Sequence, residues 1–341
     1  MPPSAAPVSP RPLRVLGTGV AVSGEAVTSE AIDARLGLAP GTVEARTGVR
    51  RRFVERRPAA VPGAEAARAA LHAAGLTLDD IDCLVAASGT PDQAMPSNAA
   101  LLHHELGLSA RGIPAFDIGA SCLGFLMALD VVSSLLVSGR YRRVLIVASD
   151  IASCGLDWSK LESSGIFGDG AAAAVVEAGE GVQAGGGAGV LAASFLTLSD
   201  AVHACEIPGG GSRHHPSRID QPFAPLATFH MDGPVIFRLA GERLRAFVDG
   251  LLAQAGLTLG AIDLVVPHQA SGHALAFMRR RLHLRADQVV DIFAERGNQV
   301  AASLPTALHE AIATGRLRRG TTALLIGTGA GVQMGGLVLR Y

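Results

Sequence analysis

Apolar and polar residues alternate along the chain in a way that predicts strands and helices in turn. Short apolar runs occur at 13–19, 84–87, 143–148 and 171–176, and stretches with helical spacing lie between them. Strands that alternate with helices are typical of α/β proteins, in which helices cover the faces of the sheets. The pattern therefore predicts an α/β fold.

The stretch 114–131 carries the most informative version of this pattern. Phe116 and Ile118 suit a strand, small residues make a tight turn, and the apolar residues after Cys122 predict a mostly buried helix. A thiol at a helix N-terminus faces free backbone N–H groups, which lower its pKa and can also hold an oxyanion. Cys122 is therefore a candidate nucleophile; the alternative is a structural core cysteine, as free cysteines usually are.

Two short motifs occur twice along the chain, in the same order. The pairs are 76–85 with 257–266, and 139–143 with 315–319. Repeats of this kind indicate two related βαβ-rich units in one chain. In the second pair the offset takes Cys122 to Asn298, so we expect these two residues at equivalent helix starts.

The repeats divide the chain into an N-terminal half over 13–180 and a C-terminal half over 186–341. Residues 1–12 are rich in Pro, Ala and Ser and predict a flexible tail. The polar, Arg-rich stretch 39–53 predicts a surface loop. The stretch 208–218 has no periodicity and predicts a mobile loop at the rim of a site.

Two further polar residues fall where predicted strands end or helices begin. His268 follows an apolar strand, and Asn298 follows Gly297 at a helix start. Each has an ordinary explanation, as a core histidine and as a helix cap. Together with Cys122 they form a nucleophile and two neutral donors, at junctions where α/β folds place functional side chains.

Composition and charge narrow the classes of function. The chain has 341 residues, is 49% hydrophobic and has a formal net charge of -1, so it can bury a large core. The near-zero charge argues against nucleic acid or an anionic membrane as partner. The 4 cysteines lie far apart, so we expect neither a metal site nor a disulfide framework. The lack of a long apolar run or a signal core predicts a cytoplasmic protein.

Short motifs follow one another along nearly the whole chain. They are Leu16-Gly-Thr-Gly19, Arg46-Thr-Gly-Val-Arg50, Met95-Pro-Ser97, Cys122-Leu-Gly-Phe125, Phe167-Gly-Asp-Gly170, Pro267-His-Gln-Ala270 and Gly297-Asn298. In order and spacing the chain resembles the β-ketoacyl-acyl carrier protein synthase III family of the thiolase superfamily. The resemblance implies a thiolase-like fold, in which two pseudo-symmetric halves form a layered α-β-α-β-α core.

The resemblance also implies a reaction. Cys122 would take an acyl group from a thioester, and His268 and Asn298 would stabilise the enolate formed as a malonyl thioester loses carbon dioxide. The enolate would attack the acyl-enzyme in a Claisen condensation, with the backbone N–H groups of Cys122 and Ala330 as oxyanion hole. Such an acyltransferase needs no cofactor, and its substrates are acyl-coenzyme A or acyl carrier protein thioesters. The implied substrate-binding residues are Met95, Phe167, Met231, Phe237, Thr328, Arg46, Gly233 and Ser271.

The entrance to the site departs from typical members of that family. Thr42 and Leu161 stand where a Trp and an Arg usually flank the mouth for coenzyme A, and Ser271 replaces an Asn. Thr328 and Ala330 stand where Phe and Gly are common. These changes favour a specialised acyl donor, in fatty acid or secondary-metabolite biosynthesis, with weak selectivity for coenzyme A.

Other functions stay open on the sequence alone. One is an acyltransferase that passes the acyl group to an oxygen or nitrogen nucleophile with His268 as base, and another is a non-catalytic subunit. A third is long-chain head-to-head condensation without decarboxylation, in which a Glu at the position of Met95 acts as base. Because Met95 is apolar, decarboxylation is favoured. The resemblance further implies a homodimer, in which the Met95 loop lines the partner's pocket, and an acyl carrier protein as partner.

Overall fold

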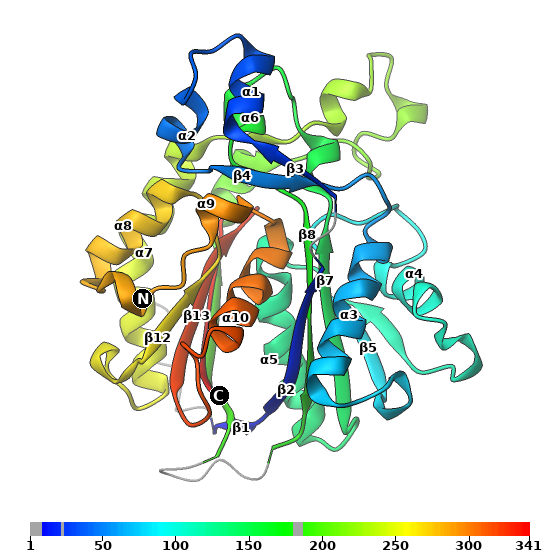
Figure 1. Cartoon of the computed structure of the whole chain (residues 1–341), viewed down its shortest axis with the longest axis vertical. Coiled ribbons are helices and arrows are strands. Elements are labelled where there is room, and N and C mark those ends of the chain that lie inside the picture. The colour runs from blue at the N-terminus through cyan, green and yellow to red at the C-terminus, as the bar shows by residue number, and fades with distance from the viewer. Residues whose placement is uncertain (1–8, 22–23, 180–186) are drawn as a thin grey trace.

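Two five-stranded sheets lie side by side in the computed structural model, which describes residues 9–21, 24–179 and 187–341 (Figure 1). The first sheet consists, in spatial order, of β2 (Arg14–Ala21), β8 (Gly170–Glu177), β7 (Arg143–Asp150), β5 (Cys83–Ala86) and β6 (Ala115–Asp117). The second consists of β1 (Arg11–Pro12), β9 (Gly189–Thr197), β14 (Gln333–Arg340), β13 (Thr322–Gly329) and β12 (Leu264–Pro267). Both sheets are mixed, because β5 runs parallel to β6 and β7, and β12 parallel to β13, while the other pairs are antiparallel.

Helices form three layers around these sheets (Figure 1). The central layer is α5 (Gly124–Val137) and α10 (Ser303–Ala313); the outer layers are α3 (Ala60–Ala74) and α4 (Asn98–Glu105) on the first sheet, and α7 (Gly233–Gln254) and α8 (Gly272–Leu282) on the second. The predicted α-β-α-β-α layering is therefore present. The smaller elements are α1 (Ser29–Leu36), α2 (Thr42–Thr47), α6 (Leu161–Ser164), α9 (Phe293–Arg296) and the two hairpins β3 (Glu25–Thr28) with β4 (Arg51–Val54), and β10 (Cys205–Glu206) with β11 (His230–Met231).

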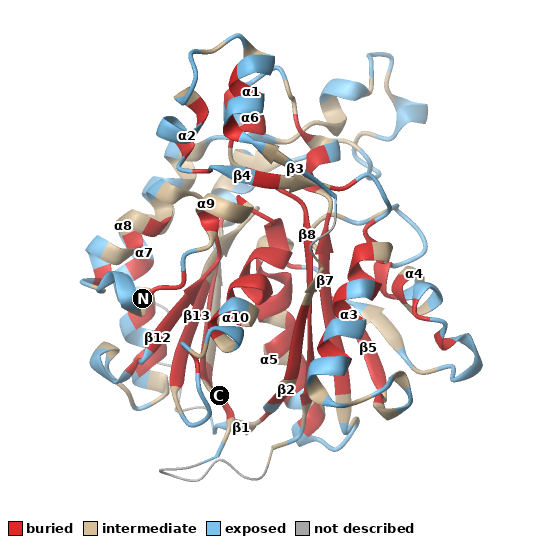
Figure 2. Cartoon of the chain, in the orientation of Figure 1, coloured by how far each residue is buried: buried red, intermediate tan, exposed pale blue. Residues whose placement is uncertain are grey.

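The central helices are buried because they are apolar on nearly every side. Leu126, Leu129 and Val132 of α5 are inaccessible to solvent and share one core cluster with Leu308 of α10. Figure 2 shows this burial through the middle of the molecule and along the strands. The core thus joins both halves of the chain, and the junctions before α5 and α10 are held from two sides.

The predicted tail over 1–12 is wrong at its C-terminal end. Arg11 and Pro12 form β1, which pairs antiparallel with β9. The Arg11 guanidinium also donates to Asp130, and to the Ser134 hydroxyl at 3.1 Å, on α5. Composition alone missed this strand because its partners are distant in sequence. Residues 1–8 and the predicted boundary between the halves at 180–186 lie outside the described residues.

The repeat is present, but its register at the site differs from the prediction. Ser121 and Val300, with φ of 48° and 52°, open equivalent 3-10 turns, η3 (Ser121–Leu123) and η10 (Val300–Ala302), each followed by a central helix. Cys122 therefore corresponds to Ala301, and Asn298 precedes the second turn. The prediction used an offset measured beyond these helices, and α10 has 11 residues where α5 has 14.

The Arg-rich stretch 39–53 was predicted as a surface loop, and this is also wrong. It contains α2 and β4, and Arg52 on β4 is completely buried. Its guanidinium donates to the Ser29 hydroxyl at 3.1 Å and to the Gly165 carbonyl at 2.7 Å, and burial lowers its pKa to about 10. A buried arginine is rare enough that a polar pattern predicts exposure instead.

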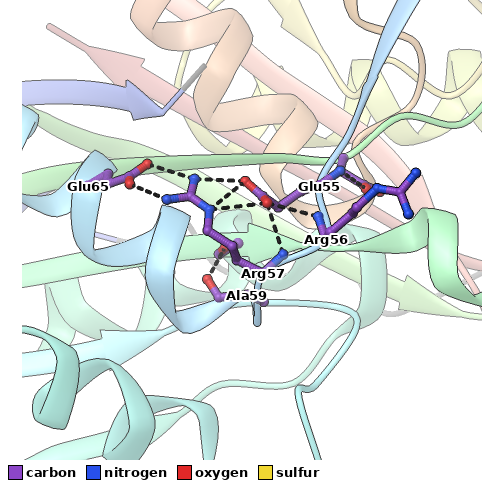
Figure 3. Close-up of polar contacts among 7 residues, drawn as sticks. Glu55, Arg56, Arg57, Ala59 and Glu65 are labelled. Atoms are coloured by element: carbon purple, nitrogen blue, oxygen red, sulfur yellow. Dashed lines mark hydrogen bonds and ion pairs between the residues drawn. The ribbon is translucent and has the colours of Figure 1, made fainter. Parts of the chain in front are cut away.

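The chain that leaves β4 is fastened to α3 by a charged network (Figure 3). Arg57 lies between Glu55 and Glu65, with ion pairs of 2.8 Å and 2.7 Å. These carboxylates raise the pKa of Arg57 above its usual range. The Glu55 backbone N–H donates to Asp169 at 2.8 Å, so the network also reaches the Phe167–Gly170 turn near the site.

Candidate active site

A cavity of about 1090 Å³ is lined by residues of both halves of the chain. Cys122, His268 and Asn298 all line it, so the structure brings the three predicted catalytic residues to one space. They arrive from the turn before α5, the end of β12 and the segment before α10. The geometry of each follows from its local backbone.

Cys122 lies in the η3 turn, where the positive φ of Ser121 bends the chain sharply before α5. β13 approaches this turn so closely that a Cβ at Gly329 would lie 3.7 Å from the Cys122 nitrogen. The prediction of a lowered thiol pKa is wrong, because burial raises the pKa of Cys122 to about 12. The backbone N–H groups of Ala330 and of Cys122 itself hydrogen-bond to the thiol and partly offset this.

His268 follows β12, and its backbone N–H donates to the Ile326 carbonyl of β13 at 2.8 Å. Gly327 allows this approach, since a Cβ there would lie 2.8 Å from the His268 Cβ. Burial lowers the pKa of His268 to about 4, so the imidazole is neutral near pH 7. Its buried Nδ1 has no hydrogen-bond partner among the described residues. The ring is therefore a neutral donor or acceptor.

Asn298 is held at both its backbone and its side chain. Its N–H donates to the Ile166 carbonyl at 2.7 Å, and its carbonyl accepts from the Gly168 N–H at 3.0 Å. Its Oδ1 accepts from the Val300 N–H at 2.9 Å, and its Nδ2 donates to the Ala270 carbonyl at 3.2 Å. The side chain therefore caps the η10 turn, which is the helix-cap explanation that the sequence had left open for Asn298. An amide nitrogen has two hydrogens, so one is left for a ligand.

The other predicted site residues divide into two groups. Arg46 and Met95 are outside the cavity lining: Arg46 is exposed, with Glu162 at 3.8 Å, and Met95 is 83% exposed. Met95 follows Gln93 and Ala94, which do line the cavity. The residues that line it as implied are Phe167, Met231, Gly233, Phe237, Ser271, Thr328 and Ala330.

Several lining residues were missed by sequence reasoning. Cys205 and the ion pair of His203 with Glu206, 2.6 Å apart, come from the segment around β10. Phe229 also lines the cavity and packs edge-on against Phe167, with ring centroids 4.9 Å apart. This region has short strands and no regular period, so no pattern in the sequence placed it beside Cys122.

The residues predicted to flank the entrance for coenzyme A do not form open walls of the cavity. Leu161 is buried against Ile32 and Val43, so it forms part of a small core rather than an open wall. Thr42 is half-buried and donates its hydroxyl to a backbone carbonyl at 2.6 Å. Trp158 packs on the same core, and the guanidinium of Arg35 covers its ring at 4.9 Å.

Two other kinds of feature are absent from the described ranges. No three His, Cys, Asp or Glu side chains there are grouped as metal ligands would be. None of the helices described is both long enough and apolar enough to cross a membrane.

Comparison with known proteins identifies the family. Models described as 3-oxoacyl-[acyl-carrier-protein (ACP)] synthase III and its C-terminal part match residues 116–197 and 252–341. The chain is 32% identical to the β-ketoacyl-[acyl-carrier-protein] synthase III of Neisseria meningitidis, over 96% of this chain and 99% of that one. The chain belongs to the β-ketoacyl-[acyl-carrier-protein] synthase III family.

Solved structures agree with this assignment. The 3-oxoacyl-(acyl carrier protein) synthase III of Pseudomonas aeruginosa has a TM-score of 0.85 and 31% identity, covering 97% of this chain and 98% of that one. The priming β-ketosynthase of a polyketide biosynthetic pathway has a TM-score of 0.86 and 29% identity, covering 99% and 98%. The thiolase-like fold is thus confirmed, and the chain is a condensing enzyme of the synthase III type and hence a transferase.

Proposed function

We propose that Cys122 takes an acyl group from a thioester and that the acyl-enzyme then condenses with a malonyl thioester. The observation that carries this proposal is the shared cavity of Cys122, His268 and Asn298, with two backbone N–H groups at the thiol. A donor carbonyl oxygen placed between the N–H groups of Cys122 and Ala330 would be stabilised as negative charge develops on it.

Acylation starts from a protonated thiol, since burial raises the pKa of Cys122 to about 12. The proton leaves as the carbon–sulfur bond forms and ends on the departing thiol, so the completed acylation leaves no net charge in the cavity. His268, a neutral imidazole in the same cavity, can accept and return it. A neutral path suits a site where burial makes charges costly.

Condensation uses the same neutral groups as donors. The carboxylate of the malonyl thioester leaves as carbon dioxide, and its electron pair becomes an enolate whose oxygen accepts hydrogen bonds from His268 and Asn298. Neutral donors stabilise the enolate without protonating it. The enolate carbon attacks the acyl carbonyl, the Cys122 thiolate leaves, and it takes from solvent the one proton that the condensation consumes.

Head-to-head condensation without decarboxylation needs a base for the α-carbon. Glu206 is the one carboxylate among the described residues that line the cavity, and it is bound to His203. We therefore propose decarboxylative condensation and test it with Glu206→Gln. This variant should release carbon dioxide and product at nearly the native rate. A selective loss of product from alkyl thioesters in that variant would favour the alternative.

The acyl donor that we propose is specialised rather than a small primer on coenzyme A. A volume of about 1090 Å³ has room for a large acyl group beside the pantetheine arm. The walls that would stack an adenine are changed: Thr42 is small, Leu161 is buried, and Arg35 already covers Trp158. We therefore propose weak selectivity for coenzyme A and a role in fatty acid or secondary-metabolite biosynthesis.

We also propose a cytoplasmic homodimer that receives substrates from an acyl carrier protein. Met95 supports the dimer, since an apolar side chain 83% exposed beside the cavity is suited to a second copy. Light scattering tests the dimer. An active monomer would contradict it.

Intact-protein mass spectrometry tests the central proposal. Native protein is incubated with acyl thioesters of different lengths on coenzyme A, on N-acetylcysteamine and on a carrier protein. We expect an adduct on Cys122 whose mass identifies the acyl group, and carbon dioxide release when a malonyl thioester follows. If no acyl group labels the protein from any carrier, the proposed function is wrong.

A further inference from the structure

A buried carboxylate joins the two halves of the chain beneath the site. Asp150, the last residue of β7, is inaccessible to solvent and does not line the cavity. Its Oδ1 accepts from the backbone N–H groups of Gly89 and Thr90, both at 2.7 Å, and from the Thr90 hydroxyl at 2.9 Å. Its Oδ2 accepts from the Ala302 N–H at 3.1 Å. One side chain thus binds segments more than 200 positions apart.

The bond to Ala302 acts on the presentation of Asn298. Ala302 closes the η10 turn, which begins at Val300 directly after Asn298 and Gln299. The same turn donates the Val300 N–H to the Asn298 Oδ1 at 2.9 Å. A shift of the turn would therefore turn the Asn298 amide, whose residue lines the cavity.

The bonds to Gly89 and Thr90 act on the nucleophile turn. Gly89 is wedged between the two catalytic turns: a Cβ there would lie 2.6 Å from the Val300 Cγ1 and 3.1 Å from the Ser121 carbonyl carbon. The position of Gly89 therefore sets how closely the Cys122 turn and the Asn298 turn approach. Asp150 fixes that position with three hydrogen bonds.

Only a carboxylate can satisfy this arrangement. Four donors converge on Asp150, and they approach both of its oxygens. An asparagine of the same shape has one oxygen, so its amino group would face an N–H on one side. Burial raises the pKa of Asp150 to about 6, which shows that the carboxylate is retained against a desolvation cost. Costly buried groups of this kind mark positions with a function.

We propose that Asp150 is the positioning residue that holds the Cys122 turn and the Asn298 turn in their reactive arrangement. The inference rests on the proposed function for its readout, because that function divides the reaction into acylation and decarboxylation. Asp150 acts on the site through the backbone of other residues, and its charge adds to the burial that raises the pKa of Cys122, but its side chain does not line the cavity.

Asp150→Asn tests the inference. The three donors from Gly89 and Thr90 outnumber the one from Ala302, so the amide oxygen should turn toward them and the amino group toward Ala302. The defect should then fall on the Asn298 side. We expect decarboxylation of the malonyl thioester to slow about 10–100-fold, the cost of a lost buried hydrogen bond at the site. Acylation of Cys122 should change less than about threefold, with the donor KM unchanged.

Thr90→Val gives the opposite pattern and covers the case in which Asp150→Asn does not fold. It removes one hydroxyl donor on the Gly89 side and leaves the Ala302 bond in place. Acylation should slow more than decarboxylation. The matched control is Asp82→Asn. Asp82 lies just before β5, and its side chain accepts from the Arg142 and Arg143 N–H groups at the start of β7, both at 2.9 Å. Both steps should stay within about twofold of native in this control.

Each outcome is decisive. A folded Asp150→Asn protein with both steps unchanged, or with both slowed equally, overturns the inference. If that variant is unfolded, a Thr90→Val protein without selective loss of acylation overturns it. If the native protein forms no acyl adduct, both the proposed function and this inference are wrong. If the native protein is acylated and the Asp150→Asn variant is unaffected, the inference is wrong but the proposed function stands.

Discussion

The two turns before the central helices have the same backbone and different chemistry. Ser121 and Val300 both have positive φ and both open a 3-10 turn that leads into a buried helix. The first turn presents a thiol at its second residue, whereas Ala301 occupies that place in the second. There the functional amide of Asn298 stands before the turn and is tied back to it. A strained turn is therefore a reusable support, and the residue placed beside it decides the chemistry.

The largest effect should come from the first turn. Cys122→Ser should lower acylation to background, because a serine hydroxyl is a much weaker nucleophile than a thiol and a much poorer leaving group in the second step. The fold should persist, since the change in volume is small. Intact mass after incubation with an acyl thioester measures this, and circular dichroism checks the fold. A covalent adduct formed at the native rate would show that another residue is the nucleophile.

The two donors to the enolate should mainly affect the second step. His268→Ala and Asn298→Ala should each slow decarboxylation by about 10²–10³, because each removes a donor to the enolate. Acylation of Cys122 should persist in Asn298→Ala, and more weakly in His268→Ala if the imidazole carries the thiol proton. Carbon dioxide release measures the second step. Native rates of release in both variants would end the enolate assignment.

The contact between the two turns can be changed by a substitution at Gly89, which belongs to neither turn. Gly89→Ala should lower the free energy of unfolding by about 1–3 kcal/mol, because its Cβ would overlap Val300 and press on Ser121. Both reaction steps should slow. The matched control is Gly119→Ala, since a Cβ at Gly119 meets nothing within 4 Å. Equal stability of the two variants in urea would show that the turns do not depend on this contact.

The pH dependence of stability separates the buried groups of the two halves. Burial lowers the pKa of His268 to about 4, so between there and 6.5 the unfolded chain binds a proton that the folded chain excludes. Stability from this group falls as pH drops through that window, by up to about 1.4 kcal/mol per pH unit. Burial raises the pKa of Asp150 to about 6, so its contribution falls as pH rises from 3.8 to 6.

His268→Gln should therefore gain stability relative to native as pH falls from 6.5 to 4.5. Asp150→Asn should gain relative to native as pH rises from 4 to 6. Urea unfolding at several pH values measures both variants. Parallel curves for the two would contradict the opposite directions of their pKa shifts.

Local chemistry at strand ends made much of the site predictable. Cys122 and His268 both follow apolar strands, and polar or reactive residues in that place are a strong signal in α/β chains. The alternation of apolar runs predicted the α/β class and the repeat predicted two related halves, whereas the layered core was implied by the family resemblance. Asn298 was found as well, although its predicted equivalence with Cys122 failed because α10 is shorter than α5.

Features that depend on distant contacts were not predictable. Asp150 ends β7, two residues beyond the predicted strand 143–148, and its partners at Gly89 and Ala302 come from segments that no local pattern joins. The raised pKa of Cys122 is likewise a consequence of burial by the whole fold. Arg52 was placed at the surface because its buried acceptors are a hydroxyl and a carbonyl, not a nearby charge.

The short strand β1 has a practical consequence for handling the protein. It pairs with Gly189 and Val190 at the start of β9, on an edge whose backbone groups would otherwise be open to another chain. A chain shortened to begin at Leu13 would expose that edge and lose the hold of Arg11 on α5. We expect such a chain to associate edge to edge and to precipitate at high concentration. Shortening for crystallisation should therefore stop before Arg11.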